Sequence, residues 1–251
     1  MQSLILAAGR GSRINELTQN VPKCLIDFNR KPLLRWQLNS LKKYSDSTII
    51  VGGYSINKIK KYVHGLPGIE IIMNKKWEST NMLYSLMCAR EKLKKKDTII
   101  SYSDIFYSTK AVEKLYNSKD EIAILYDPNW QKLWTQRFKN PLDDAESFKV
   151  DDNFYLLEIG NKLKNMSNCI GQFMGLLKIT KEGWSLVEKI TKNYNVKFDN
   201  IDTTSFINYL LKKNIKIKAI PSYESWGEVD TYNDLKLYEN MLANKYFKWM
   251  L

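Results

Sequence analysis

The chain contains few of the residues that build disulfide frameworks and metal–thiolate sites: 3 Cys and 1 His among 251 residues. Cys24, Cys88 and Cys169 lie far apart and show no paired spacing, so we expect them to be reduced and structural. With His64 as the single histidine, they cannot supply the ligands of a zinc site. The sequence therefore predicts neither a zinc-thiolate centre nor a disulfide scaffold.

Long apolar runs are also missing, and none approaches the roughly 18–20 residues of a membrane span. The first eight residues lack the basic start and the long apolar core of a signal peptide, so we interpret them as a first strand. Only 11 Gly and 6 Pro occur, and 44% of the residues are hydrophobic, which indicates an ordered globular protein. We expect one cytoplasmic domain over 1–251 with no membrane partner.

Acidic residues are the minority, since 39 Lys and Arg against 27 Asp and Glu give a net charge of +12. Much of the excess lies in the lysine clusters at 92–96 and 212–218, which we expect on helix ends and solvated faces. A basic nucleic-acid-binding protein is the alternative hypothesis, and it predicts salt-sensitive binding. The sequence shows no nucleic-acid motif, so we expect no nucleic-acid partner.

Short apolar runs alternate with helical patterns along most of the chain, which predicts an α/β fold. Because helices separate the strands, the expected architecture is a Rossmann-like, mostly parallel sheet flanked by helices, with ligands beyond the carboxyl ends of the strands. The expected strands are Ser3–Ala7, Thr48–Val51, Glu70–Met73, Thr98–Tyr102, Ile122–Leu125 and Lys216–Ile220. The expected helices are Pro32–Tyr44, Ile56–His64, Asn81–Leu93, Thr109–Asn117, Gly183–Asn193, Thr203–Lys213 and one from Tyr232.

The segment 127–180 departs from this alternation and is rich in Trp, Asp and Asn. It suggests short strands at Phe148–Val150, Phe154–Ile159 and Phe173–Ile179. We interpret it as a lid subdomain over the sheet.

The first strand leads into a loop of Gly, Arg and Ser at 9–13, and the pair Pro22-Lys23 follows. Free backbone N–H groups in such a loop, together with fixed positive charge, favour a triphosphate. A P-loop is excluded because the loop closes on Gly-Ser-Arg rather than Gly-Lys-Ser/Thr. A dinucleotide fingerprint is excluded because Ile14 stands where the third glycine is required.

Two aspartates are expected at the same edge of the sheet, each next to an expected strand or helix. Asp104 comes directly after the fourth strand, and Asp230 directly precedes the last helix. Two carboxylates together with phosphate oxygens suit Mg²⁺, which tolerates few protein ligands. The alternatives are a helix N-cap for Asp230 and an Asx turn for Asp104.

Several motifs resemble the nucleotidyltransferases that activate phosphorylated sugars and alcohols. Those that carry the resemblance are Leu6-Ala-Ala-Gly-Arg-Gly-Ser-Arg13, Pro22-Lys23, and the aspartate that ends the fourth strand. The block Thr80-Asn-Met-Leu-Tyr-Ser-Leu86 narrows it to the small cytidylyltransferases, a group that includes the phosphocholine and phosphoglutamine enzymes. The resemblance covers most of the chain and implies the nucleotidyltransferase fold, with Mg²⁺ as cofactor.

The resemblance also implies residue roles. Lys23, Arg13, Asp104 and Asp230 would be catalytic, and the two aspartates would hold Mg²⁺. The nucleotide-binding residues would be Leu6, Ala7, Ala8, Gly9, Arg10, Gly11, Ser12, Gly53, Ser79, Thr80 and Asn81. Lys162 is a candidate for the acceptor phosphate.

The acceptor is expected to carry a cation, because Trp130 and Trp134 occur near Asp144 and Glu146. Arg137 would pair with an acceptor carboxylate. The alternative is that the tryptophans are core residues and the acids are solvated. The overall sequence most resembles the cytidylyltransferases of capsular phosphoramidate synthesis, so the expected reaction is CMP transfer from CTP to L-glutamine phosphate. Phosphocholine and a sugar 1-phosphate are the alternative acceptors.

Overall fold

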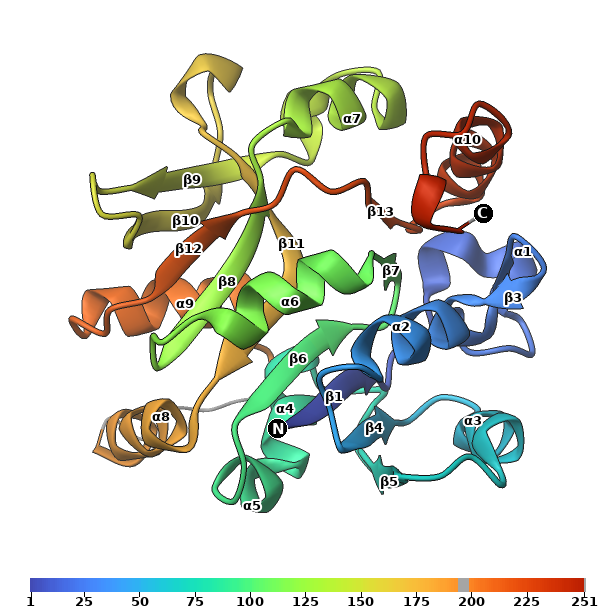
Figure 1. Ribbon diagram of the computed structural model, residues 1–251, viewed down its shortest axis with the longest axis horizontal. Helices are drawn as coiled ribbons and strands as arrows, with labels where there is room; N and C mark the ends of the chain where they lie inside the picture. The colour runs from blue at the N-terminus through green and yellow to red at the C-terminus, as the bar shows by residue number, and fades with distance from the viewer. Residues whose placement is uncertain (194–198, 251) are drawn as a thin grey trace.

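A seven-stranded sheet in the order β12-β8-β11-β6-β1-β4-β5 forms the centre of the fold (Figure 1). The structure is a computed structural model that describes residues 1–193 and 199–250. The strands of this sheet are β1 Gln2–Ala7, β4 Ser47–Gly52, β5 Ile69–Met73, β6 Thr98–Tyr102, β8 Ile122–Asp127, β11 Gln172–Ile179 and β12 Lys218–Pro221. Three strand pairs outside it are β2 Asp27–Phe28 with β3 Lys31–Pro32, β7 Ile105–Phe106 with β13 Gly227–Glu228, and β9 Glu146–Val150 with β10 Leu156–Lys162.

Helices lie on both faces of the sheet, as the alternating pattern predicted. The α-helices are α1 Asn15–Thr18, α2 Leu33–Leu41, α3 Ile56–Val63, α4 Met82–Cys88, α5 Arg90–Leu93, α6 Thr109–Asn117, α7 Trp130–Arg137, α8 Lys181–Asn193, α9 Thr203–Lys212 and α10 Tyr232–Ala243. Short 3-10 helices are η1 Ser12–Ile14, η2 Lys23–Leu25, η3 Pro141–Asp143, η4 Met166–Asn168 and η5 Lys248–Met250. Figure 1 shows α2 and α6 in front of the sheet, with α4 and α9 behind it.

Local sequence explains the helix that covers the middle of the sheet. In α6, Ser108 accepts a hydrogen bond from the Ala111 backbone N–H as N-cap, and Ala111, Val112 and Leu115 bury one face. This helix packs against β6, β8 and β11. Among the residues that the structure describes, no helix combines the length and the apolar character needed to cross a bilayer.

Two elements differ from the sequence-based expectation. The predicted strand at Phe173–Ile179 does not belong to a lid but is part of β11, which lies between β6 and β8 and runs antiparallel to both. The expected long helix at 81–93 is interrupted at Ala89, so α4 and α5 are separate. The segment 127–180 therefore leaves the sheet as α7, β9 and β10 and returns to it as β11.

The parallel strands place the predicted site at one edge of the sheet. β1 pairs in parallel with β6 on one side and with β4 on the other. The loops that follow Ala7, Gly52 and Tyr102 therefore emerge next to one another.

Candidate active site

The loop after β1 folds back onto η2, the turn that carries Lys23. Gly11 adopts a φ of +75°, and a Cβ there would lie 2.9 Å from Cβ of Lys23. Glycine is therefore required both for the left-handed conformation and for the close approach of the lysine. Gly9, Arg10 and Ser12 are exposed, so their backbone and side chains are accessible to a ligand.

Lys23 joins the three chain segments that carry the predicted catalytic residues. Its Nζ lies 2.8 Å from Oδ2 of Asp104 and 2.5 Å from Oδ1 of Asp230. Arg13 Nη1 lies 3.0 Å from the other oxygen of Asp230. Burial acts to lower the pKa of Lys23, but Asp104 and Asp230 outweigh it and raise that pKa above its ordinary value. The four residues predicted to be catalytic thus form one cluster.

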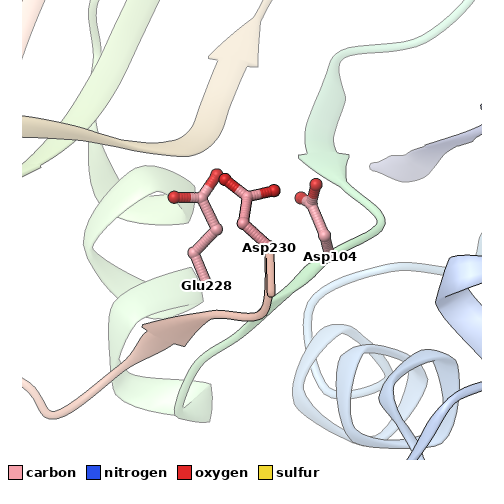
Figure 2. A group of neighbouring side chains, drawn as sticks. All are labelled: Asp104, Glu228 and Asp230. Carbon is pink, nitrogen blue, oxygen red and sulfur yellow. The ribbon is translucent and has the colours of Figure 1, made fainter. Parts of the chain in front are cut away.

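A third carboxylate, which the sequence reasoning did not assign to the site, completes this cluster. Figure 2 shows Glu228 pointing toward the same space as Asp104 and Asp230, and ligand oxygens of the three lie within 4.8 Å of one another. β13 pairs with β7 and sets Glu228 opposite Ile105, the residue after Asp104. The spacing of two between Glu228 and Asp230 was the signal available in the sequence, because alternate residues of an extended segment share a face.

Mutual repulsion and burial affect the protonation of these carboxylates. Burial, then the charge of Asp230, raises the pKa of Glu228 to about 8. Asp230 shows the opposite direction: burial raises its pKa, but the attraction of Lys23 and the two nearby arginines lowers it overall. Oδ1 of Asp104 is buried and has no hydrogen-bond partner among the described residues. An unsatisfied buried oxygen beside two further carboxylates fits a hard divalent cation such as Mg²⁺.

A small cavity adjoins the glycine loop. It has a volume of about 90 Å³ and lies between the end of β1 and the segment that leads into α4. Its lining residues are Leu6, Ala8, Gly9, Trp77, Thr80, Asn81, Met82 and Ser85. Five of them were predicted to bind nucleotide, so the structure brings the loop and the Thr80-Asn81 block to one site.

Three further predicted nucleotide-binding residues, Ala7, Gly53 and Ser79, adjoin or contact residues that line this cavity. Ala7 ends β1 and is buried, and the exposed Ser79 hydroxyl donates to the Lys76 carbonyl. A Cβ on Gly53 would lie 2.4 Å from Cβ of Trp77 and 2.7 Å from the carbonyl oxygen of Ala8. Gly53 therefore allows the Trp77 segment to pack against the glycine loop.

The predicted aromatic cage is not formed by Trp130 and Trp134. Both lie on α7 and are buried, at 1% and 3% exposure, with ring centroids 5.9 Å apart. Arg137, on the same helix, has a fully buried side chain that pairs with Asp234 at 2.9 Å and Glu228 at 3.1 Å. The structure therefore supports the alternative interpretation for the two tryptophans, and it gives Arg137 internal partners instead of an acceptor carboxylate.

Two of the other predicted acceptor residues, Asp144 and Glu146, form an acidic group together with Asp202. Trp134 Nε1 donates to Asp144 at 3.0 Å, and burial raises the pKa of Asp144. Burial, then the charges of Asp202 and Asp144, raises the pKa of Glu146 to about 6. The exposed Lys162 stands opposite Glu146 in the β9–β10 pair. Asp202 was missed because its sequence signal is that of an N-cap, and it does cap α9.

Comparisons with known proteins identify a family and several relatives of this chain. The family described as MobA-like NTP transferase domain matches residues 3–142. A CTP:phosphoglutamine cytidylyltransferase from Campylobacter jejuni is 36% identical over 250 residues, which cover 94% of this chain and 98% of that protein. A choline-phosphate cytidylyltransferase from Streptococcus pneumoniae is 37% identical over 94 residues, covering 37% of this chain and 41% of that protein.

A solved structure shows the same fold. The inositol-1-phosphate CTP transferase from T. maritima superposes with a TM-score of 0.76 at 21% identity, over 97% of this chain and 96% of that one. The chain therefore has the fold of this solved transferase.

Proposed function

This chain belongs to the family of MobA-like NTP transferase domains, and we propose that it transfers CMP from CTP to L-glutamine phosphate with release of pyrophosphate. The observation that carries the transfer chemistry is the contact of Lys23 with Asp104 and Asp230. This contact brings the Lys23 ammonium and two carboxylates together beside the glycine loop. The choice of acceptor rests on the relative that is 36% identical over nearly the whole of both chains.

The nucleotide binds through groups that the fold already holds in place. Backbone N–H groups from Ala8 to Gly11, with Arg10 and Arg13, bind the triphosphate, and the base enters the cavity lined by Thr80 and Asn81. Lys23 neutralises the negative charge that develops on the α-phosphate. Fixed charges of this kind stabilise the transition state because they need little reorganisation during the reaction.

The reaction needs no strong general base. The acceptor phosphate is already a nucleophile, and it attacks the α-phosphorus of CTP in line as pyrophosphate leaves. Asp104, Asp230 and Glu228 would hold Mg²⁺, which supplies charge neutralisation on the nucleotide phosphates when bound. Bound Mg²⁺ would lower the pKa of Glu228, because a nearby positive charge favours the ionised carboxylate.

The acidic group beside the site suits the α-ammonium of the acceptor. Burial, and then the charge of Asp202, raises the pKa of Glu146, and a cation beside Glu146 would offset both effects. Lys162, which stands opposite Glu146, would bind the acceptor's phosphate or carboxylate. In this proposal α7, β9 and β10 are the part of the 127–180 segment that covers the acceptor.

Pyrophosphate release tests the proposal. The purified protein is incubated with CTP and Mg²⁺ and one of three acceptors: L-glutamine phosphate, phosphocholine or a sugar 1-phosphate. We expect the highest kcat/KM with L-glutamine phosphate, and no release from Asp104→Asn under the same conditions. Preference for phosphocholine or the sugar phosphate would overturn the acceptor and leave CMP transfer standing. No release with any acceptor would overturn the transfer itself.

A further inference from the structure

A larger cavity opens at the other end of the central strands from the active site. It has a volume of about 630 Å³ and is lined by residues before β6, after α6 and around the end of β11. β6 relates the two sites, because Asp97 at the cavity precedes this strand and Asp104 of the active site follows it. A strand of 5 residues spans roughly 15 Å, so the cavity is separate from the active site.

The side chains that line this cavity carry mostly positive charge. Five of its lining residues are lysines: Lys95, Lys96, Lys119, Lys178 and Lys181. Asp97 is the one carboxylate in the described lining, and its Oδ1 accepts a hydrogen bond from the backbone N–H of Lys181. Lys96 approaches Asp46 at 4.0 Å. Within residues 1–193 and 199–250, the other four lysines have no carboxylate within ion-pair distance.

Lys178 is the least expected of these residues, because it lies on a central strand. It is 4% exposed and stands opposite Ile99 of β6 and Ala123 of β8, a position where an apolar side chain is expected. Its Nζ donates to the carbonyl of Ser118, at the end of α6, at 2.6 Å. An ammonium has three donors, so this bond leaves two for another partner.

The surroundings of Lys178 do not fully neutralise it. Burial lowers its pKa, Asp97 and Asp120 oppose that shift, and Lys119 adds to it. The negative end of the α6 dipole gives partial compensation. A buried ammonium facing further lysines across an open cavity is favourable when an anion joins them.

We propose that this cavity binds a multiply charged phosphate anion, held by Lys178 at its base and by Lys95 and Lys119 at its rim. The compact charge of each ammonium suits phosphate oxygens. Tyr116 lines the cavity and is 45% exposed, with its ring centroid 4.9 Å from that of Tyr44, and its exposed part would contact a nucleoside attached to the phosphates. The site is separate from the acceptor and does not depend on which acceptor is used.

Calorimetric titration of the full chain with inorganic tripolyphosphate tests the site. Because the active site also binds phosphates, we expect two sites per chain. Replacing Lys95→Gln and Lys119→Gln together should weaken one of them by about tenfold or more, since each lost charge-assisted hydrogen bond is worth about that factor. The matched control is Lys60→Gln with Lys61→Gln on α3, which removes the same charge from an exposed helix end. CTP turnover should be unchanged in both double variants.

Lysine acetylation followed by mass spectrometry locates the binding. Tripolyphosphate should protect Lys95 and Lys119 but leave Lys60 reactive. Equal protection at all three would show diffuse charge attraction and overturn the proposal. One site per chain, unaffected by the Lys95/Lys119 double substitution, would overturn it as well.

Lys178→Met separates a ligand-binding role from simple capping of α6. If the proposal holds, this variant loses tripolyphosphate binding at the cavity whether or not its free energy of unfolding changes. If Lys178 only caps the helix, stability falls and binding at the cavity is unaltered, which would overturn the role of Lys178. Parallel titrations with pyrophosphate, CTP and cytidine distinguish a free phosphate anion from a nucleotide as the ligand of the cavity. If pyrophosphate binds and CTP binds no more tightly, the cavity recognises phosphate alone. Tighter binding of CTP would add the contact with Tyr116.

Discussion

Lys23 contacts one oxygen of each of the two aspartates that would hold a divalent cation. It lies 2.8 Å from Oδ2 of Asp104 and 2.5 Å from Oδ1 of Asp230, and its side chain is only 9% exposed. An ammonium and a divalent cation would therefore compete for the negative charge of these carboxylates. A triphosphate in the glycine loop offers Lys23 another partner, so nucleotide and metal should favour each other's binding.

Lys23→Gln tests this competition through two measurements with opposite directions. Turnover should fall by about 10²–10³, because one charge contact to the transition state is lost. Affinity for Mn²⁺ in the absence of nucleotide, followed by electron paramagnetic resonance, should rise because the competing ammonium is gone. Lys31→Gln, which removes an ammonium near the Trp36 ring, is the control and should change neither quantity. Unchanged or weaker Mn²⁺ binding in Lys23→Gln would contradict the competition.

Glu146 gives a pH dependence of known sign. Its pKa is raised from 4.5 to about 6, so the folded state holds this proton in a pH range where the unfolded state has released it. The free energy of unfolding should therefore fall as pH rises from 4.5 to 6, by about 2 kcal/mol at most. Glu146→Gln should remove this part of the slope. Urea unfolding at several pH values measures both proteins, and identical slopes would show that Glu146 does not titrate in this range.

At the scale of elements, α7 connects the segment beyond the sheet to the C-terminal helix. Arg137 ends α7 and pairs with Glu228 of β13 and with Asp234 in the first turn of α10. Asp234 also accepts hydrogen bonds from the backbone N–H groups of Asp230 and Thr231. The position of Asp230 in the active site thus depends on packing between these two helices.

Arg137→Met should destabilise the protein strongly. Removing one partner of a buried ion pair leaves the Asp234 carboxylate without its cation, which costs about 3–5 kcal/mol, and Glu228 loses the same donor. The free energy of unfolding in urea measures this loss. Arg90→Met is the control, because the Arg90 side chain is 56% exposed and its one ion-pair partner among the described residues is the exposed Glu91, so a change within about 0.5 kcal/mol is expected. A loss no larger than that of the control would show that α7 is not anchored through Arg137.

The contact between the Trp77 segment and the glycine loop can be tested with a pair of glycines. Gly53→Ala places a Cβ against Trp77 and the Ala8 carbonyl and should cost about 1–3 kcal/mol of stability. Gly9→Ala meets no atom within 4 Å, so its stability should stay within about 0.5 kcal/mol of the parent. Both changes should raise KM for CTP, Gly53→Ala by moving the cavity wall and Gly9→Ala by blocking close approach of the phosphates. Normal KM in both variants would place the nucleotide elsewhere.

The elements also show where sequence reasoning succeeds. The strands β1, β4 and β6 and the convergence of Lys23 with Asp104 were predictable, because parallel strands bring their carboxyl ends to one edge. The direction of β11 was not, since a buried strand has the same apolar pattern in either direction. The helix α7 had a readable signal: Trp130, Leu133, Trp134 and Arg137 follow the i, i+3, i+4, i+7 spacing of a helix face.

At the scale of the whole molecule, ligand binding should appear as thermal stabilisation. CTP with Mg²⁺ at about 100 times its Kd adds about 2.7 kcal/mol, which for a chain of this length raises Tm by about 5–10 °C. Chelation of the metal with EDTA should remove most of that shift, because the carboxylate cluster then repels the triphosphate. Differential scanning fluorimetry measures both conditions. An equal shift with and without EDTA would show that nucleotide binding does not involve the metal.

The whole-molecule arrangement explains why the residues proposed for the acceptor were the hardest to predict. Composition suggested a cage of acidic and aromatic groups in 127–180, but it could not tell which side chains face inward. The Trp134 side chain is buried in the core and donates a hydrogen bond to Asp144. Asp202, which affects Glu146, belongs to a segment far away in the sequence. Such assignments depend on tertiary packing, which no local pattern contains.

The Lys23–Asp230 contact joins residues 207 positions apart in the sequence. During synthesis, the glycine loop and most of the sheet are available long before the carboxylates that complete the catalytic cluster. A nascent or truncated chain that ends before β13 therefore has the glycine loop but lacks Glu228 and Asp230, two of the three carboxylates in the cluster. Contacts of such long separation also form late in folding, because the loop-closure entropy must first be overcome. Catalytic competence should thus appear as the last event of folding, after the nucleotide loop has formed.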